Sequence, residues 1–125
     1  MRTQNDYNVL AVDDSPSMRA MLKQTLVQAG YRCEGAENGQ DALDKAHAEH
    51  FDLIIMDINM PVMNGIEAIT ELRKFDNYKS APILVLSTES RDEIKQQGKK
   101  AGATGWIVKP FDPVKLLTAL KRVLA

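Results

Sequence analysis

Short apolar runs alternate along this chain with segments in which apolar residues recur every three or four positions. The runs are typical of β-strands, and several of them are apolar at every position, which indicates strands that are buried on both faces. We expect five strands, at 9–12, 31–36, 53–56, 83–86 and 106–108.

Each predicted strand is followed by a segment with helical spacing. Ser15 can cap the first of these helices, Pro16 suits its first turn, and Gly30 ends it. Asp112 and Pro113 open the last helix in the same way. The helices are expected at 15–30, at 39–49, around 66–72, at 91–101 and from 113 onward.

The alternation of strands and helices predicts an α/β fold, with a parallel sheet that helices cover on both faces. Sheets of this kind bind their ligands in the crevice beyond the carboxyl ends of the strands. The residues that follow each strand are therefore the candidates for chemistry.

The composition sets limits on the class of protein. A chain of 125 residues fits one domain, and a net charge of -1 gives no reason to expect binding to nucleic acid or to a membrane surface. Its apolar runs are too short to cross a membrane, and the polar segment 1–7 predicts no signal peptide. Cys33 is the single cysteine, so we expect no internal disulfide and a cytoplasmic protein.

Polar residues follow four of the five predicted strands. They are Asp13 and Asp14, then Asp57, then Ser87 and Thr88, and finally Lys109. Three carboxylates at one edge of a sheet repel each other, and a divalent cation relieves that repulsion. Hard oxygen ligands at a hydrated site suit Mg²⁺, and no cluster of Cys and His offers a softer metal a site.

Each of these residues also has an ordinary structural explanation. The acidic pair and Asp57 could serve as turn residues, because Asp is common in turns. Ser87 and Thr88 could cap the fourth helix, and Lys109 could be a solvated surface lysine. The joint placement at the ends of four strands favours a functional site.

The sequence carries four motifs in a fixed order and spacing: Val12-Asp13-Asp14-Ser15, the segment Met56 to Gly65, Leu86-Ser87-Thr88-Glu89, and Val108-Lys109-Pro110-Phe111. In these motifs the chain resembles the receiver domains of two-component systems, and in particular the single-domain chemotaxis regulators of the CheY type. The resemblance extends from about residue 9 to 124. It implies a flavodoxin-like, doubly wound (βα)5 fold with a five-stranded parallel sheet in the order 2-1-3-4-5.

The resemblance also implies a role for each motif residue. Asp57 corresponds to the carboxylate that accepts a phosphoryl group. Asp14, Asp57 and the backbone carbonyl of Asn59 correspond to direct Mg²⁺ ligands, and Asp13 to a ligand through water. Ser87 and Lys109 match the hydroxyl and the ammonium that bind the phosphoryl group, and the Lys109–Pro110 peptide bond is expected to be cis.

Trp106 stands at the family's switch position, where Tyr or Phe is commoner. It could report phosphorylation by turning inward, or it could simply pack beneath the last two helices. Partners are expected to recognise the face formed by the fourth helix, fifth strand and fifth helix. No output domain is expected after Ala125, and the protein is expected to act as a monomer.

The implied partners are a histidine kinase of the chemotaxis type, a flagellar motor switch protein or another phospho-dependent partner, and a phosphatase. The chain is not expected to be an enzyme beyond catalysing its own phosphorylation and dephosphorylation. A phosphate sink for a shared kinase remains an alternative. A small aspartyl-phosphate hydrolase is disfavoured because no cap domain forms a substrate pocket, and a flavodoxin is disfavoured because the acidic turn after the first strand would repel a flavin phosphate.

Overall fold

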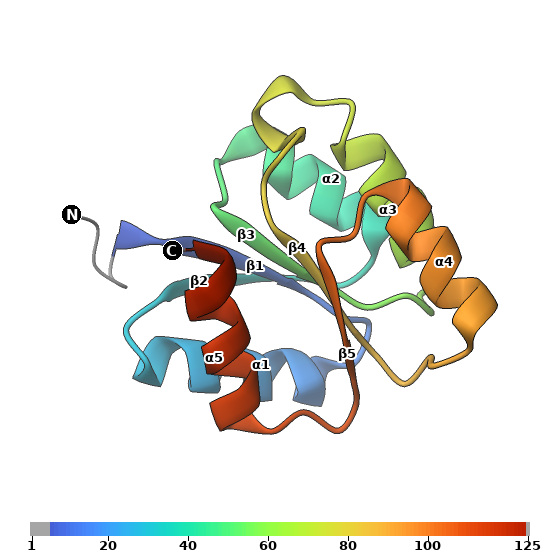
Figure 1. Cartoon of the computed structure of the whole chain (residues 1–125). Coiled ribbons are helices and arrows are strands. Elements are labelled where there is room, and N and C mark those ends of the chain that lie inside the picture. Colours follow the sequence, from blue (N-terminus) through green and yellow to red (C-terminus); the bar gives the residue numbers. More distant parts are fainter. Residues whose placement is uncertain (1–5, 125) are drawn as a thin grey trace.

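The computed structural model describes residues 6–124 and has a five-stranded parallel sheet at its centre (Figure 1). The strands are β1 (Asn8–Val12), β2 (Arg32–Ala36), β3 (Leu53–Met56), β4 (Ile83–Ser87) and β5 (Gly105–Val108). Their order is β2-β1-β3-β4-β5, which confirms the predicted topology. Most of segment 1–7, for which we expect no signal peptide, lies outside the described residues, as does Ala125.

Helices cover both faces of the sheet. They are α1 (Pro16–Gln28), α2 (Gly39–Ala48), α3 (Gly65–Leu72), α4 (Asp92–Ala101) and α5 (Pro113–Leu124), with a short 3-10 helix η2 (Asp76–Tyr78) after α3. Figure 1 shows α1 and α5 on one face and α2, α3 and α4 on the other. Within residues 6–124, no helix has the length and apolar content needed to cross a bilayer.

The core consists of two apolar layers, one on each face of the sheet. Leu10, Ile54 and Val85 point towards α2 and α3, whereas Val9 and Ile55 point towards α1 and α5. Strand β3 is buried at every position, as its uninterrupted apolar run predicts. The central strands are therefore held from both sides, and their carboxyl ends are rigid supports for the residues that follow.

Local signals account for the helix ends. Ser15 accepts a hydrogen bond from Met18 N at the start of α1, and Gly30 follows the helix with a φ of 100°, a conformation that suits glycine. Asn64 and Glu67 form a reciprocal capping box at the start of α3. The helices thus begin close to the carboxyl edge of the sheet, beside the predicted site.

Tyr78 joins η2 to the end of α2. Its side chain is fully buried, and its hydroxyl donates to the carbonyl groups of Ala46 and Glu49, both 3.1 Å away. The same oxygen accepts a hydrogen bond from Phe51 N at 3.1 Å. One hydroxyl therefore satisfies several backbone groups at the point where the chain leaves α2 and enters β3.

Tyr78→Phe is expected to lower the free energy of unfolding by about 1–3 kcal/mol, because it leaves the Phe51 N–H buried without its acceptor. Urea denaturation followed by circular dichroism measures the loss. Tyr7→Phe is the matched control: the Tyr7 hydroxyl donates to Leu124 O in a partly exposed position, so its removal should cost less. Equal stability of Tyr78→Phe and the wild-type protein would contradict the role of this hydroxyl.

Candidate functional site

The carboxyl edge of the sheet brings together the residues predicted from the sequence. Asp13 follows β1, Asp57 follows β3, Ser87 ends β4 and Lys109 follows β5. Asp13, Asp57 and Ser87 are buried, with exposed fractions of 1%, 6% and 0%. Buried polar side chains in such a position need specific partners, and these partners define the site.

Lys109 connects the two buried carboxylates. Its Nζ lies 2.6 Å from Asp13 Oδ2 and 3.1 Å from Asp57 Oδ2, and its side chain is only 12% exposed. Burial lowers the pKa of Lys109, but hydrogen bonds and charge attraction from Asp13 and Asp57 outweigh it and keep the pKa above its ordinary value. Lys109 is therefore a charged group within the site, and the solvated-lysine explanation is wrong.

The carboxylate, the backbone N–H and the carbonyl of Asp13 each have a hydrogen-bond partner. Its Oδ1 accepts a hydrogen bond from Ser15 N at 2.9 Å, which is the turn geometry expected of an Asp before a helix. Its own N–H donates to Ala36 O, and its carbonyl accepts from Arg19 Nη1 at 2.6 Å. The Asp13 carboxylate thus forms the turn with Ser15 N and also contacts Lys109.

The three carboxylates are close enough to hold one cation. Asp13, Asp14 and Asp57 each offer an oxygen, and these oxygens lie within 4.8 Å of one another. Asp14 is exposed, whereas the other two are buried, so the group opens to water on one side. Oxygen donors at a half-open, hydrated position match the requirements of Mg²⁺.

Close backbone contacts position the loop after Asp57. A Cβ on Gly65 would lie 2.0 Å from Asp57 O, so no other residue fits there, and Gly65 N donates to Ile58 O at 2.9 Å. Between them, Val62 has a φ of 71° and is 81% exposed, and Met63 N donates to Pro61 O at 2.8 Å across it. A positive φ is unfavourable for a β-branched residue, so the loop is strained beside the site. Asn59 lies in this exposed loop.

Ser87 and Trp106 are both linked to Glu89. The Ser87 Oγ accepts a hydrogen bond from Glu89 N at 3.2 Å, and the Trp106 Nε1 donates to Glu89 O at 2.9 Å. Helix α4 begins after Arg91 and has no side-chain cap, so the interpretation of Ser87 and Thr88 as helix caps is wrong. The reason is that segment 88–91 separates Ser87 from the first turn of α4.

Arg19 was not among the predicted site residues. It comes from α1 and donates to the Asp13 carbonyl, and its side chain passes beside Gly35, where a Cβ would lie 3.3 Å from Arg19 Cδ. The sequence places this arginine four residues after the helix cap Ser15, one turn into the helix and close to the site. Its partner is a backbone carbonyl outside the helix, and the spacing of side chains does not reveal such a contact. Its contact helps to fix the turn that carries Asp13 and Asp14.

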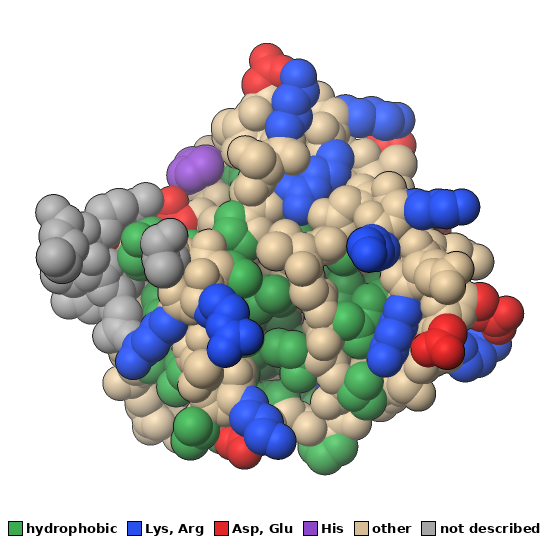
Figure 2. All heavy atoms as spheres, in the orientation of Figure 1, with side chains coloured by type: hydrophobic (Ala, Val, Ile, Leu, Met, Phe, Trp, Pro, Cys, Tyr) green, Lys and Arg blue, Asp and Glu red, His purple; other side chains and the backbone are tan. Residues whose placement is uncertain are grey.

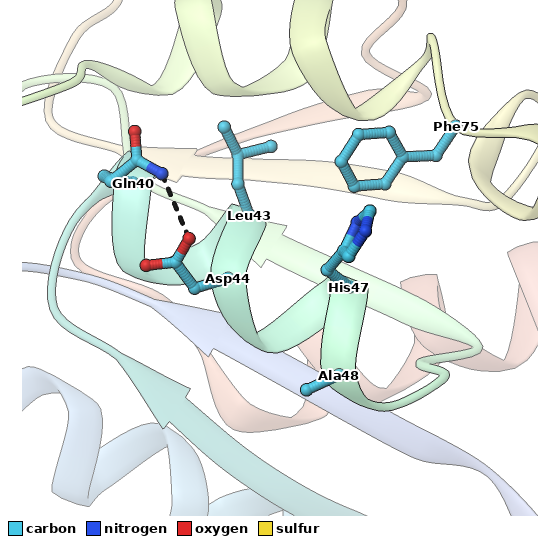
Figure 3. Close-up of a pocket in the computed structure, with 6 residues that line it drawn as sticks. All are labelled: Gln40, Leu43, Asp44, His47, Ala48 and Phe75. Carbon is cyan, nitrogen blue, oxygen red and sulfur yellow. Dashed lines mark hydrogen bonds between the residues drawn. The ribbon is translucent and has the colours of Figure 1, made fainter.

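A groove of about 400 Å³ lies away from this edge, along α2 and beside the segment after α3. Figure 3 shows Leu43, His47 and Phe75 lining it, with the Gln40 amide hydrogen-bonded to Asp44. The His47 and Phe75 rings meet edge to face at 5.1 Å. None of the predicted site residues lines this groove, so it is separate from the carboxylate site.

Comparison with known proteins agrees with this geometry. The family model of the response regulator receiver domain matches residues 9–121. The chain is 44% identical to the chemotaxis protein CheY of Thermotoga maritima, over 92% of this chain and 95% of that protein. It is 54% identical to the chemotaxis protein CheY4 of Vibrio cholerae, with a TM-score of 0.91 and coverage of 94% and 98%.

A second similar structure bears on the metal. The receiver domain of the sensor histidine kinase PA1611 from Pseudomonas aeruginosa, solved with a magnesium ion in its active-site cleft, matches with a TM-score of 0.88 and 28% identity. The match covers 94% of this chain and 97% of that domain. The family match, the two chemotaxis relatives and the acidic edge of the sheet lead to one conclusion. This chain belongs to the response regulator receiver domains, the phosphoryl-accepting modules of two-component signalling, and is of the chemotaxis type.

Proposed function

We propose that this protein accepts a phosphoryl group from a chemotaxis-type histidine kinase on Asp57, with Mg²⁺ bound beside it. The observation that carries the proposal is the position of the Lys109 ammonium between Asp13 and Asp57 at the open carboxyl edge of the sheet. Phosphorylated protein then binds a flagellar motor switch protein or another phospho-dependent partner in the cytoplasm. A phosphatase or the protein itself removes the group.

The chain's own groups are suited to each part of the transfer. Asp57 is the nucleophile: a carboxylate oxygen attacks phosphorus, the P–N bond to the kinase histidine breaks, and an aspartyl phosphate forms. Lys109 is already within hydrogen-bond distance of Asp57, where it can balance charge on the transferred group. Ser87 supplies a hydroxyl that can donate to a phosphoryl oxygen, since in its hydrogen bond with Glu89 N its Oγ is the acceptor.

The residues around Asp57 also fit a magnesium ion. Asp14, Asp57 and the Asn59 carbonyl would hold it directly, and Asp13 through a water molecule, because the Asp13 carboxylate already contacts Lys109 and Ser15 N. When bound, Mg²⁺ supplies positive charge for the phosphoryl oxygens. Asp14 is exposed and so can reach an ion that keeps part of its water shell.

The face of α4, β5 and α5 is the proposed partner surface. Figure 2 shows Lys and Arg side chains around hydrophobic ones on this side of the molecule. A pocket of about 240 Å³ lies here between α4 and β5, and Lys95, Lys99 and Trp106 contribute to its lining. A partner segment that combines acidic and apolar side chains would complement this surface.

The loop between the site and this face is held by a charged pair. The Arg91 guanidinium donates to both Glu89 carboxylate oxygens, at 2.9 and 2.8 Å. These hydrogen bonds, together with one from the Arg91 backbone N–H, lower the pKa of Glu89 to about 2. The Glu89 side chain therefore stays ionised over the physiological pH range, and its ion pair with Arg91 is retained over that range.

Asp57→Asn is expected to abolish phosphorylation by a chemotaxis-type kinase or by acetyl phosphate, because an amide oxygen is a poor nucleophile. Transfer of radiolabelled phosphate, with hydroxylamine release to identify the acyl phosphate, measures the reaction. Asp44→Asn, which changes an exposed carboxylate on α2, is the control and should keep full labelling. Full labelling of Asp57→Asn would place the phosphoryl group elsewhere.

Asp14→Ala is expected to weaken Mg²⁺ binding by about tenfold or more, since it removes a carboxylate from the group of three. Isothermal titration calorimetry of the unphosphorylated protein measures the affinity. Glu67→Gln removes an exposed carboxylate at the start of α3 and should bind the ion like the wild-type protein. Equal affinity in Asp14→Ala and wild type would remove Asp14 from the ligand set.

Lys99→Glu is expected to weaken partner binding by roughly threefold or more at low salt, because it reverses a charge at the rim of the pocket on α4. Binding of beryllofluoride-loaded protein to candidate flagellar switch proteins can be followed by fluorescence anisotropy. Lys74→Glu reverses an exposed charge after α3 and serves as the control. Similar losses in the two variants would move the partner surface away from α4.

A further inference from the structure

Asp14 differs from the other two carboxylates in how its side chain is supported. It is exposed, and among residues 6–124 no hydrogen bond or ion pair holds its carboxylate. The Asp13 carboxylate, by contrast, contacts Ser15 N and Lys109. The direction in which Asp14 offers its oxygens therefore depends on the backbone that carries it.

Arg19 holds the peptide group that joins Asp13 to Asp14. Its Nη1 donates to the Asp13 carbonyl oxygen at 2.6 Å, in a partly buried position. That carbonyl and the Asp14 N–H belong to one rigid, planar group, so a hydrogen bond to the oxygen fixes the plane from which Asp14 projects. The donor is a charged guanidinium, which makes stronger hydrogen bonds than a neutral group.

Strand β2 leaves the space that this side chain needs. A Cβ on Gly35 would lie 3.3 Å from Arg19 Cδ and 3.8 Å from Arg19 Nε, whereas the bare glycine lets the side chain pass. The φ of Gly35 is not positive, so the glycine matters here for space and not for backbone conformation. The next residue, Ala36, accepts a hydrogen bond from Asp13 N at 3.1 Å. The peptide groups on both sides of the Asp13 Cα are thus held, one by β2 and one by Arg19.

We propose that Arg19 is a positioning residue of the magnesium site, which holds peptide group 13–14 so that the Asp14 carboxylate is directed towards Asp57, and that Gly35 provides the space for its side chain. The inference rests on the proposed function, since it takes Asp14 as a direct Mg²⁺ ligand. It assigns a role in metal affinity to a residue that contacts neither the ion nor a carboxylate.

The charge of Arg19 and its contact predict opposite effects on the metal. A guanidinium this close to the carboxylates repels a cation, so removal of the charge alone should tighten Mg²⁺ binding. Loss of the hydrogen bond should weaken binding, because the peptide plane and the Asp14 carboxylate would then have to be ordered when the ion binds. The sign of the change therefore separates the two effects.

Arg19→Met keeps an unbranched apolar side chain and removes the donors. We expect its Mg²⁺ affinity to fall about tenfold, as is usual when a partner that orients a metal ligand is lost. Titration with Mg²⁺ alone, followed by the Asp57 amide cross-peak in NMR, measures it. Arg19→Lys should recover part of the affinity, because an ammonium can donate to the same carbonyl. Wild-type or tighter binding in Arg19→Met would overturn the proposal.

Lys23→Met is the matched control for the loss of charge. It removes a cation from an exposed position of α1, one turn after Arg19. Its affinity for Mg²⁺ should equal that of the wild-type protein or be slightly higher. A tenfold loss in Lys23→Met as well would overturn the proposal, because the effect would then not depend on the contact with Asp13.

A double-mutant cycle shows whether Arg19 acts through Asp14. In an Asp14→Ala background, Arg19→Met should cause less than about a twofold further loss of affinity, because the group that it positions is already gone. A general loosening of the fold would lower the affinity again by the full factor. That result would overturn the positioning role.

Gly35→Val tests the same contact with the charge of Arg19 retained, and it decides the question if Arg19→Met does not fold. Valine suits a strand, and its branched side chain would take the space of Arg19 Cδ and move the guanidinium away from Asp13 O. We expect Mg²⁺ affinity to fall about threefold or more. Wild-type affinity in Gly35→Val would overturn the proposal.

Asp14→Ala separates failure of this inference from failure of the proposed function. Weaker binding in Asp14→Ala together with wild-type binding in Arg19→Met would overturn the role of Arg19 and leave the ligand set intact. Wild-type binding in Asp14→Ala would instead overturn the ligand set, and with it the role of Asp14 as the group that Arg19 positions.

Discussion

Repulsion between carboxylates at one edge of a parallel sheet is the constraint on which the rest of this structure depends. Asp13 and Asp57 are both buried there, and two buried anions of like charge are costly without a cation between them. Lys109 supplies that cation from β5, on the far side of β4. Its reach passes the end of β4, where Ser87 provides a small side chain, and its own N–H donates to Ser87 O at 2.9 Å. The charge requirement after β1 and β3 thus links these two strands to β5 across the end of β4.

Glycines hold the loops close enough for this arrangement. Gly65 lies directly against the Asp57 carbonyl, and Gly39 lies against Met63, where a Cβ would come within 2.6 Å of the Met63 carbonyl oxygen. Gly39 N also donates to that oxygen at 3.0 Å. The loop after Asp57 is therefore fixed at both ends while its middle, around Val62, remains exposed. The positive φ of Val62 is the strain that this double attachment maintains.

The sequence predicts the parts of this molecule that depend on short-range patterns. Apolar runs locate four of the five strands, whereas β2 has the weaker, partly polar sequence of Arg32–Ala36. Because parallel strands end at one edge, Asp13, Asp57 and Lys109 could be grouped without coordinates. The missed features depend on contacts between distant segments: η2 is held by the Tyr78 hydroxyl, whose acceptors lie in and just after α2. Val62 has a positive φ, which β-branched residues disfavour, so its residue type predicts a negative φ at this position. The placement of the site residues is thus predictable, whereas the contacts that support them are not.

The distribution of burial decides which parts of the fold can respond to the site. Strands β3 and β4 are buried at every position, so a change at Asp57 has little room to act through the sheet. Helix α4 is different, because Gly98 is its one buried residue and its polar faces are solvated. The segment between them starts at a fully buried Ser87 and becomes exposed within a few residues. The less buried backbone on this side of the site is therefore segment 88–91, which leads from Ser87 to the uncapped start of α4.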